Sequence, residues 1–212
     1  MRTVFAVLRA AAVVLTAVAV IATFTDTASR SAINPFNFFG YFTIQSNIIA
    51  AVVLAVTAYA GFTRSPQSSA LLIARGASAT YMIIVGLVYN TLLVGLAGGA
   101  DLPWANSVLH VVMPIYIALD WVLFGDRSPL PWNRYWIVLI YPLVWLGVVL
   151  IRVGTDGWVP YPFLNFHDPA LGGGGVALYC LAIAVGFAGF GAIVWALSRV
   201  RILGAPGAPA AA

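Results

Sequence analysis

A few side chains that can do chemistry stand inside long apolar stretches of this sequence. Thr43, Ser46 and Asn47 follow one another at spacings of three and one, so they share one face of a helix. His110 stands in a second apolar stretch and Asn90 in a third. A hydroxyl beside an imidazole is what nucleophilic catalysis requires, because a weak nucleophile needs a base to accept its proton. Asn47 or Asn90 would then be placed to donate a hydrogen bond to the developing oxyanion.

Each of these residues also has a structural explanation. A threonine in a membrane helix commonly bonds its own carbonyl four residues back, and asparagine side chains commonly join neighbouring helices. Pro114, four residues after His110, is expected to bend its helix and free the carbonyl of His110. Asp120 lies ten residues after His110 and projects about 80° away from it. We therefore expect Asp120 to anchor the inner interface or to pair with Arg127 or Arg134.

The composition decides what kind of protein positions these residues. Of 212 residues, 62% are hydrophobic and only 8% are charged, whereas about 25% of a soluble domain is charged. The mean hydropathy is +0.99. This composition excludes a soluble enzyme, a nucleic-acid-binding protein and a disordered regulator, and it predicts an all-α polytopic membrane protein. All basic residues are Arg and all acidic residues are Asp, which suggests a high-GC bacterial coding sequence and hence a bacterial inner membrane.

Six segments are long and apolar enough to cross a bilayer as helices, and none alternates as a membrane β-strand would. The first lacks a clear small-residue cleavage site, so we interpret it as a span rather than a signal peptide. The expected domain is 1–203, followed by a disordered tail over 204–212. The predicted spans are Val4–Phe24, Phe38–Phe62, Gly76–Ala97, Ser107–Phe124, Tyr135–Ile151 and Gly174–Leu197.

Arginine placement predicts the orientation of these spans. Eight arginines fall at the ends that six spans would bring to the side of the two termini, and only Arg30 and Arg152 fall on the other side. Because basic residues favour the cytoplasmic side, both termini are expected inside. With a rise of 1.5 Å per residue, Thr43 and His110 then lie roughly 5–8 Å below the outer boundary and Asn90 at about 10 Å.

Three further patterns have expected roles. The aromatic, proline-interrupted loop over 157–168 is expected to form a rigid cap over the outer mouth of the bundle, and the run Gly172–Gly175 is expected to be flexible. Ala184, Ala188 and Ala192 form a stripe of small residues suited to close helix packing or oligomerisation. Two histidines and one cysteine are too few to predict a metal site or a disulfide.

The residues assembled so far resemble the androgen-induced membrane protein family, in its bacterial branch, over most of the six-span core. The resemblance is carried by Tyr41-Phe42-Thr43 with Gln45-Ser46-Asn47, Leu109-His110-Val111-Val112-Met113-Pro114, Asp120-Trp121, and Gly157-Trp158-Val159 with Tyr161-Pro162-Phe163. Animal members are multi-pass hydrolases of fatty acid esters of hydroxy fatty acids that use a threonine and a histidine. The resemblance implies that Thr43 is the nucleophile and His110 the base, with Ser46 as a rival nucleophile.

The sequence therefore predicts an intramembrane threonine hydrolase of lipid esters that needs no cofactor. Its expected partners are membrane lipids or a lipid-ester substrate and not nucleic acid. Ser46, Asn47, Asn90, Trp158 and Tyr161 are the expected substrate-binding residues. A membrane carrier or lipid-binding protein that uses the polar cluster around His110 is the alternative, and a non-catalytic scaffold is a third possibility.

Overall fold

A computed structural model describes residues 1–95, 102–200 and 202–203. Six of the helices in these ranges are long and apolar enough to cross a membrane. The described residues form no strand beyond one isolated bridge between Phe124 and Leu203. The chain is thus an all-α polytopic membrane protein with six spans, which confirms the fold class predicted from composition.

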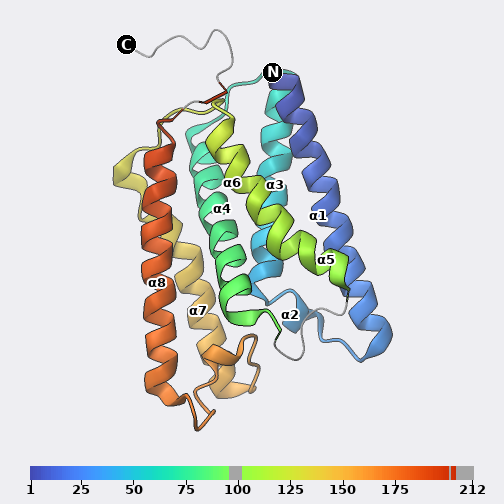
Figure 1. Cartoon of the computed structure of the whole chain (residues 1–212), viewed down its shortest axis with the longest axis vertical. Helices are drawn as coiled ribbons and strands as arrows, with labels where there is room; N and C mark the ends of the chain where they lie inside the picture. The colour runs from blue at the N-terminus through green and yellow to red at the C-terminus, as the bar shows by residue number, and fades with distance from the viewer. Residues whose placement is uncertain (96–101, 201, 204–212) are drawn as a thin grey trace.

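The helices follow one another as an up-and-down bundle (Figure 1). Spans three to five are each assembled from two or three consecutive helical segments. The elements are α1 (Arg2–Arg30), α2 (Pro35–Phe38), α3 (Phe42–Thr63), α4 (Ser69–Val88) with the π-helix η1 (Tyr89–Leu93), α5 (Pro103–Ser107) with the π-helix η2 (Val108–Val112) and α6 (Met113–Leu123), η3 (Trp132–Arg134) with α7 (Ile137–Thr155), η4 (Pro162–Leu164) and α8 (Gly172–Leu197).

Several predicted boundaries were wrong. The third span begins at Ser69 rather than Gly76, because Ser68 caps the helix by accepting a hydrogen bond from the amide of Leu71. The glycine run that we expected to be flexible forms the first turn of α8. The first helix also continues past its predicted end to Arg30. Ala97, the predicted end of the third span, and the predicted tail over 204–212 lie outside the described residues.

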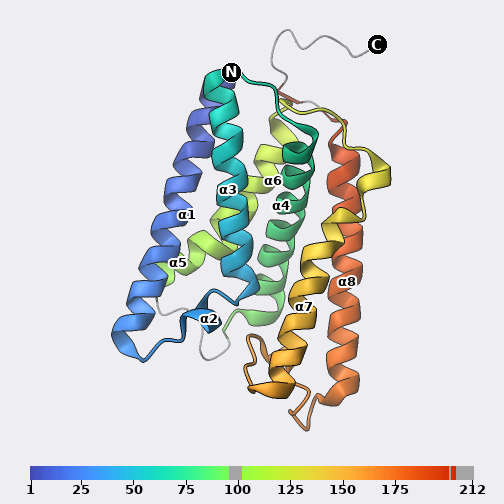
Figure 2. The same cartoon turned by 180° about the vertical axis from the view of Figure 1, so that it is seen from behind.

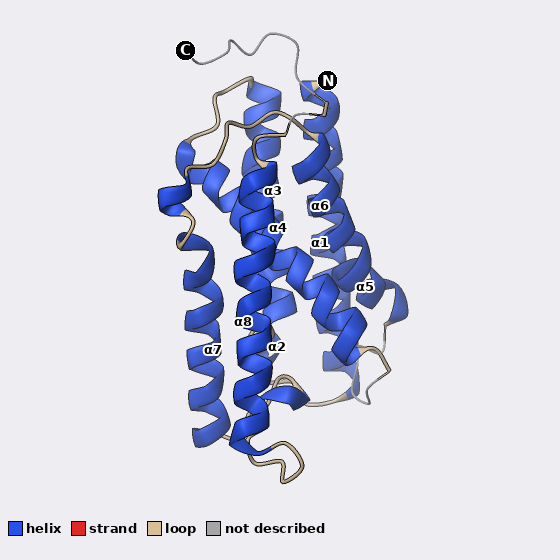
Figure 3. Ribbon diagram, turned by 60° about the vertical axis from the view of Figure 1, so that its left-hand side comes forward, coloured by secondary structure: helices blue, strands red, loops and turns tan. Residues whose placement is uncertain are grey.

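The two ends of the bundle differ in what they carry. The start of α1 and the end of α8 lie at one end, which we call the termini end, and α2 with the start of α3 lies at the opposite, far end (Figures 1 and 2). The helix α4 runs through the middle, with 67% of its span buried, whereas α7 and α8 are each only 22% buried and lie side by side at one flank (Figure 3). The far end is therefore where the start of α3, the two π-helices η1 and η2 and the loop after α7 can bring the predicted site residues together.

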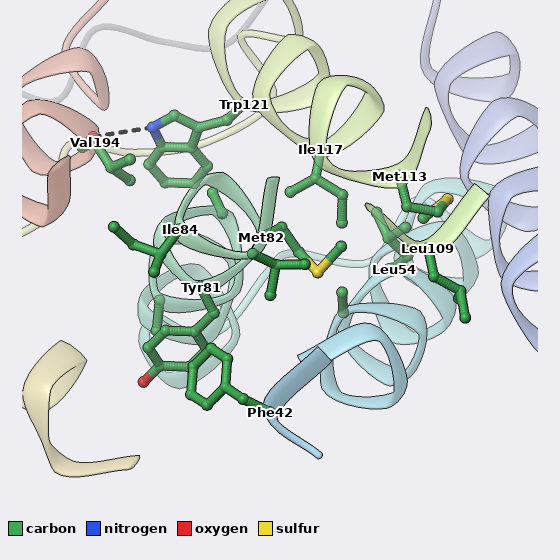
Figure 4. Close-up of a cluster of buried hydrophobic side chains, with 14 of the residues drawn as sticks. Phe42, Leu54, Tyr81, Met82, Ile84, Leu109, Met113, Ile117, Trp121 and Val194 are labelled. Carbon is green, nitrogen blue, oxygen red and sulfur yellow. Dashed lines mark hydrogen bonds between the residues drawn. The ribbon is translucent and has the colours of Figure 1, made fainter. Parts of the chain in front are cut away.

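Small residues on α4 let its neighbours approach closely. A Cβ atom added at Gly86 would lie 2.9 Å from the Cβ of Pro114, so this contact requires glycine. Met82 of α4 is fully buried and belongs to the same cluster of buried apolar side chains as Leu109 and Ile117 (Figure 4). The close approach at Gly86 places η1 beside η2, which is the pairing on which the candidate site is built.

A buried ion cluster joins α1, α4 and α6 at the termini end. Asp120 accepts hydrogen bonds from Arg9 Nε at 2.7 Å and from Arg75 Nη2 at 3.2 Å, and Asp126 pairs with the same two arginines. Gln67 bridges Arg75 and Asp126. We expected Arg127 or Arg134 as the partner of Asp120. Its ion pairs run to arginines from two other spans, which spacing along one helix does not reveal.

Candidate functional site

Two π-helical segments face each other at the far end, one ending the third span and one within the fourth. Pro114 has no N–H, so the wider turn of η2 leaves the carbonyl of Leu109 without a helical donor. Asn47 on α3 supplies one, because its Nδ2 donates to the Leu109 carbonyl at 3.1 Å. Asn90 on η1 donates at 3.4 Å to the carbonyl of His110. The two amides thus support the backbone that carries the histidine.

The imidazole of His110 is held on two sides. Its Nδ1 lies 3.1 Å from the carbonyl oxygen of Asn106, and its ring stacks on that of Tyr89 with centroids 3.9 Å apart. The side-chain amide of Asn106 donates in turn to the hydroxyl of Tyr89. Because a carbonyl only accepts, Nδ1 carries the hydrogen and the neutral ring keeps a lone pair on Nε2. No described residue makes a hydrogen bond with Nε2, so this nitrogen is available as a base.

A cavity of about 150 Å³ lies beside this cluster. It is lined by residues from the start of α3, the last turns of α4 with η1, α7, α8, and the loop segment that includes η4. Its walls are almost entirely aliphatic or aromatic. The lining residues that carry a hydroxyl group are Thr43, Tyr89 and Tyr161, and Cys180 carries a thiol. The cavity is therefore an apolar chamber with a few polar groups, as expected for a site that binds a lipid-like ligand.

Thr43 and Tyr161 meet at the wall of this cavity. Thr43 is only 7% exposed and lies in the first turn of α3, where the backbone amides have no helical partners. Its amide donates to the Tyr161 hydroxyl at 3.3 Å. Burial raises the pKa of Tyr161 to about 12, although hydrogen bonds with the Thr43 side chain and backbone oppose the rise. Tyr161 is thus protonated at neutral pH, so its hydroxyl can act as a hydrogen-bond donor.

The aromatic loop covers this end of the bundle. Trp158 packs on Gly40, where an added Cβ would lie 2.6 Å from the indole, and edge-on against Tyr41. The guanidinium of Arg152 stacks over the Trp158 ring at 4.3 Å. Tyr161, Phe163 and Leu164 of the same loop line the cavity, whereas Trp158 does not. Trp158 therefore fastens the loop to the bundle, and Tyr161 is the predicted binding residue that reaches the chamber.

Two neighbours of Thr43 on α3 carry buried polar atoms that lack partners at normal hydrogen-bond geometry. The Asn47 Oδ1 atom is buried and makes no hydrogen bond with any described residue, and the buried Ser46 hydroxyl has no partner at normal hydrogen-bond geometry, although it lies close enough to the Tyr141 side chain to interact with it. Both Asn47 amide hydrogens, in contrast, are committed to the carbonyls of Thr43 and Leu109. In this arrangement Asn47 acts as an interhelical brace, and donating to an oxyanion would cost one of these bonds.

The predicted catalytic pair lies in one cluster but not on one wall. Thr43 lines the cavity, whereas His110 does not, and the ring of Tyr89 that stacks on the imidazole does. Thr43 and His110 are not joined by a hydrogen bond in the described part of the chain. Tyr89 and Asn106 were missed as site residues. Asn106 lies four residues before His110, and this spacing is a signal that could have pointed to Asn106.

No protein-family model matches the chain, and neither does any curated protein or solved structure.

Proposed function

We propose that this protein is an intramembrane hydrolase of lipid esters in which Thr43 is the nucleophile and His110 the base. One observation carries the proposal: Thr43, a buried threonine, lines an apolar cavity within a membrane bundle, and its amide donates to the hydroxyl of Tyr161, which lines the same cavity. A chamber of this kind suits an ester whose acyl part is apolar. A hydroxyl is a weak nucleophile until a base takes its proton, and the free Nε2 of His110 supplies one in the same cluster.

The chemical steps follow from the groups that are present. Thr43 Oγ1 attacks the acyl carbon while its proton passes to Nε2 of His110, and the carbonyl oxygen becomes an oxyanion. Tyr161 donates a hydrogen bond from its hydroxyl to this oxyanion. Collapse breaks the ester C–O bond, and the leaving alkoxide takes the proton from His110. Water then gives a proton to the same imidazole while its oxygen attacks the acyl carbon of the acyl-threonine. The bond between that carbon and Thr43 Oγ1 breaks, Oγ1 takes the proton back from His110, and the fatty acid is released.

The Tyr89 ring sets a condition on this mechanism. Because Tyr89 stacks on the imidazole and lines the cavity, which His110 does not, we infer that its ring must turn aside for the proton transfer to occur. The π-helical turn that carries Tyr89 is a local irregularity of the kind often found at functional sites. We therefore expect Tyr89→Ala, which removes the ring but leaves the histidine, to retain hydrolysis, and His110→Ala to abolish it.

The same ring favours a second candidate function, a lipid-binding or carrier protein. If Tyr89 stays in place, the cavity holds an acyl chain beside a threonine that no base activates. The two functions differ in whether Thr43 can be acylated, so the experiment that distinguishes them measures covalent modification of Thr43.

The test is covalent labelling of the purified protein, in detergent and in liposomes, with a long-chain fluorophosphonate. We expect one adduct, on the peptide that contains Thr43, and loss of the adduct in Thr43→Val and in His110→Ala. The matched control is Thr57→Val, which alters another buried threonine of α3 whose hydroxyl donates to the Val53 carbonyl. Absence of any adduct, combined with no cleavage across a panel of p-nitrophenyl esters, would favour the carrier. An adduct on Ser46 would reassign the nucleophile.

Tyr161→Phe tests the oxyanion step separately. Removing one oxyanion donor commonly costs about 10²–10³-fold in kcat. We expect a loss of that order with little change in KM, since the hydroxyl contributes most in the transition state. An unchanged kcat would remove Tyr161 from the mechanism.

A further inference from the structure

The cavity reaches the lipid-facing surface of the bundle. Leu143 on α7 and Ala184 on α8 both line it, yet Leu143 is 59% exposed and Ala184 is also exposed. These two helices lie side by side at one flank (Figure 3). The outward-facing neighbours of these residues, Val144 and Val185, are aliphatic and more than half exposed. In a membrane such a surface faces acyl chains, so the seam between α7 and α8 connects the chamber with the bilayer.

The opposite wall of the cavity is deep inside the protein. Ile84 and Val85 on α4 line it and are only 3% and 4% exposed. Toward the far end the chamber is covered by Phe163 and Leu164 of the loop, both buried. A ligand that touches Ile84 or Val85 must therefore have entered the bundle, and the apolar route to them runs through the seam.

The size of the chamber limits what it can hold. An engineered apolar cavity of about 150 Å³ stays dry and binds benzene, and the cavity here has about the same volume. It accommodates roughly six carbon atoms by that comparison. A longer chain has to continue outward between α7 and α8. Ala184, with its single methyl group, leaves room at that point of the seam.

We propose that the cavity is an acyl-chain site entered sideways from the bilayer through the α7–α8 seam. The occupant is the acyl chain of a membrane lipid ester, with its first carbons in the chamber beside Thr43 and the remainder among the surrounding lipids. The position of the ester at Thr43 rests on the proposed hydrolase function, whereas entry through the seam does not require Thr43 to react.

The experiment uses the full chain in phosphatidylcholine liposomes that contain a photoreactive phosphatidylcholine, with a diazirine in the first six carbons of one acyl chain. After irradiation, labelled peptides are mapped by mass spectrometry. Lipids that merely surround the protein will label the exposed sides of α7 and α8. Labelling at Ile84 or Val85 reports occupancy of the chamber, because surrounding lipids cannot reach these residues.

Three variants test the route. Ala184→Trp and Leu143→Trp place a bulky ring in the seam from its two sides. Ala182→Trp is the matched control, because Ala182 is also exposed on α8 but lies about 200° around the helix from Ala184 and does not line the cavity. We expect each seam variant to lower α4 labelling at least fivefold relative to labelling of the outer surface, and the control to leave that ratio unchanged.

Two results would overturn the inference: no label on α4 in the unmodified protein, or α4 labelling that persists in both seam variants. The variant Thr43→Val distinguishes entry through the seam from catalysis. We expect it to be labelled on α4 as the unmodified protein is, but to form no fluorophosphonate adduct. If the unmodified protein is labelled on α4 but cleaves no ester, the hydrolase proposal is refuted, and the cavity remains a lipid-binding site entered from the bilayer.

Discussion

The ion cluster at the termini end and the candidate site at the far end are both polar and both lie at membrane-spanning helices, but they differ in how their polar atoms are partnered. At the termini end, two arginines and two aspartates give a formal charge of zero, and each aspartate contacts both Arg9 and Arg75. At the far end, Ser46 Oγ and Asn47 Oδ1 are buried without partners at normal hydrogen-bond geometry, His110 has a free Nε2 atom, and a cavity adjoins the group.

This difference separates a structural polar cluster from one suited to chemistry. Polar groups inside a membrane are costly, so each needs a partner or a role. The charged groups of the ion cluster are already paired with one another and join α1, α4 and α6. The cavity beside them, of about 10 Å³, holds one water at most. The far-end site keeps hydrogen-bonding capacity and space. A ligand can therefore bind only where polar groups still lack hydrogen-bond partners. Substitutions at the far end should lower turnover but not stability, and substitutions in the ion cluster should lower stability but not turnover.

The largest expected effect is on turnover at the far end. Thr43→Val keeps the shape of the side chain but removes the hydroxyl, and we expect it to lower kcat by roughly 10³-fold or more, with no loss of thermal stability in detergent. Thr43→Ser retains a nucleophile and should keep measurable turnover. Combining Thr43→Val with His110→Ala should cost no more than either change alone, because nucleophile and base act as a unit. Additive losses would argue that the two residues act independently.

The termini end should show the reverse signature. Asp120→Leu leaves Arg9 and Arg75 with one carboxylate between them, and breaking a buried pair in this way costs about 3–5 kcal/mol. We expect a large fall in the free energy of unfolding, measured by chemical denaturation in micelles, and unchanged kcat per folded molecule. The double variant Arg9→Met with Asp120→Leu removes one charge of each sign. It should be less destabilised than Asp120→Leu alone. A larger loss in the double variant would contradict the view that charge balance within the ion cluster stabilises the fold.

Acid should weaken the ion cluster only at low pH. Burial alone would raise the pKa of Asp126, but its hydrogen bond with Arg9 and the charges of Arg75 and Arg9 outweigh burial and lower the pKa to about 2. The ordinary value is 3.8, so the contribution of Asp126 to stability is present above that pH and is lost as the pH falls toward 2. It amounts to roughly 2 kcal/mol. Unfolding free energies that stay level from pH 7 to about 4 and then decline would fit; a decline beginning near pH 6 would not.

The sequence was informative where one helix supplies the evidence and uninformative where several helices do. Hydropathy located all six spans, because length and apolarity are local properties. It missed the first two turns of α4, because Arg75 reads as a loop residue until its partners on α6 and in the following loop are known. The contact of Asn47 with the Leu109 carbonyl depends on the π-helical turn before Pro114, and the stacking of Tyr89 on His110 depends on Gly86. Both follow from packing between helices, which spacing along the chain does not encode.

The smallest expected effect is the one that best sharpens the assignment of the far-end site. Ser46 shares the α3 face of Thr43 and is fully buried, so it is not a helix-surface residue. It does not line the cavity. Because the Ser46 hydroxyl makes no hydrogen bond of normal geometry, little is lost when it is removed, so Ser46→Ala should change the free energy of unfolding by less than about 1 kcal/mol and leave kcat within twofold. Steady-state kinetics and unfolding of the same preparation measure both. Abolished turnover in Ser46→Ala, with turnover surviving in Thr43→Val, would make Ser46 the nucleophile and would mean that the catalytic hydroxyl works from behind the cavity wall.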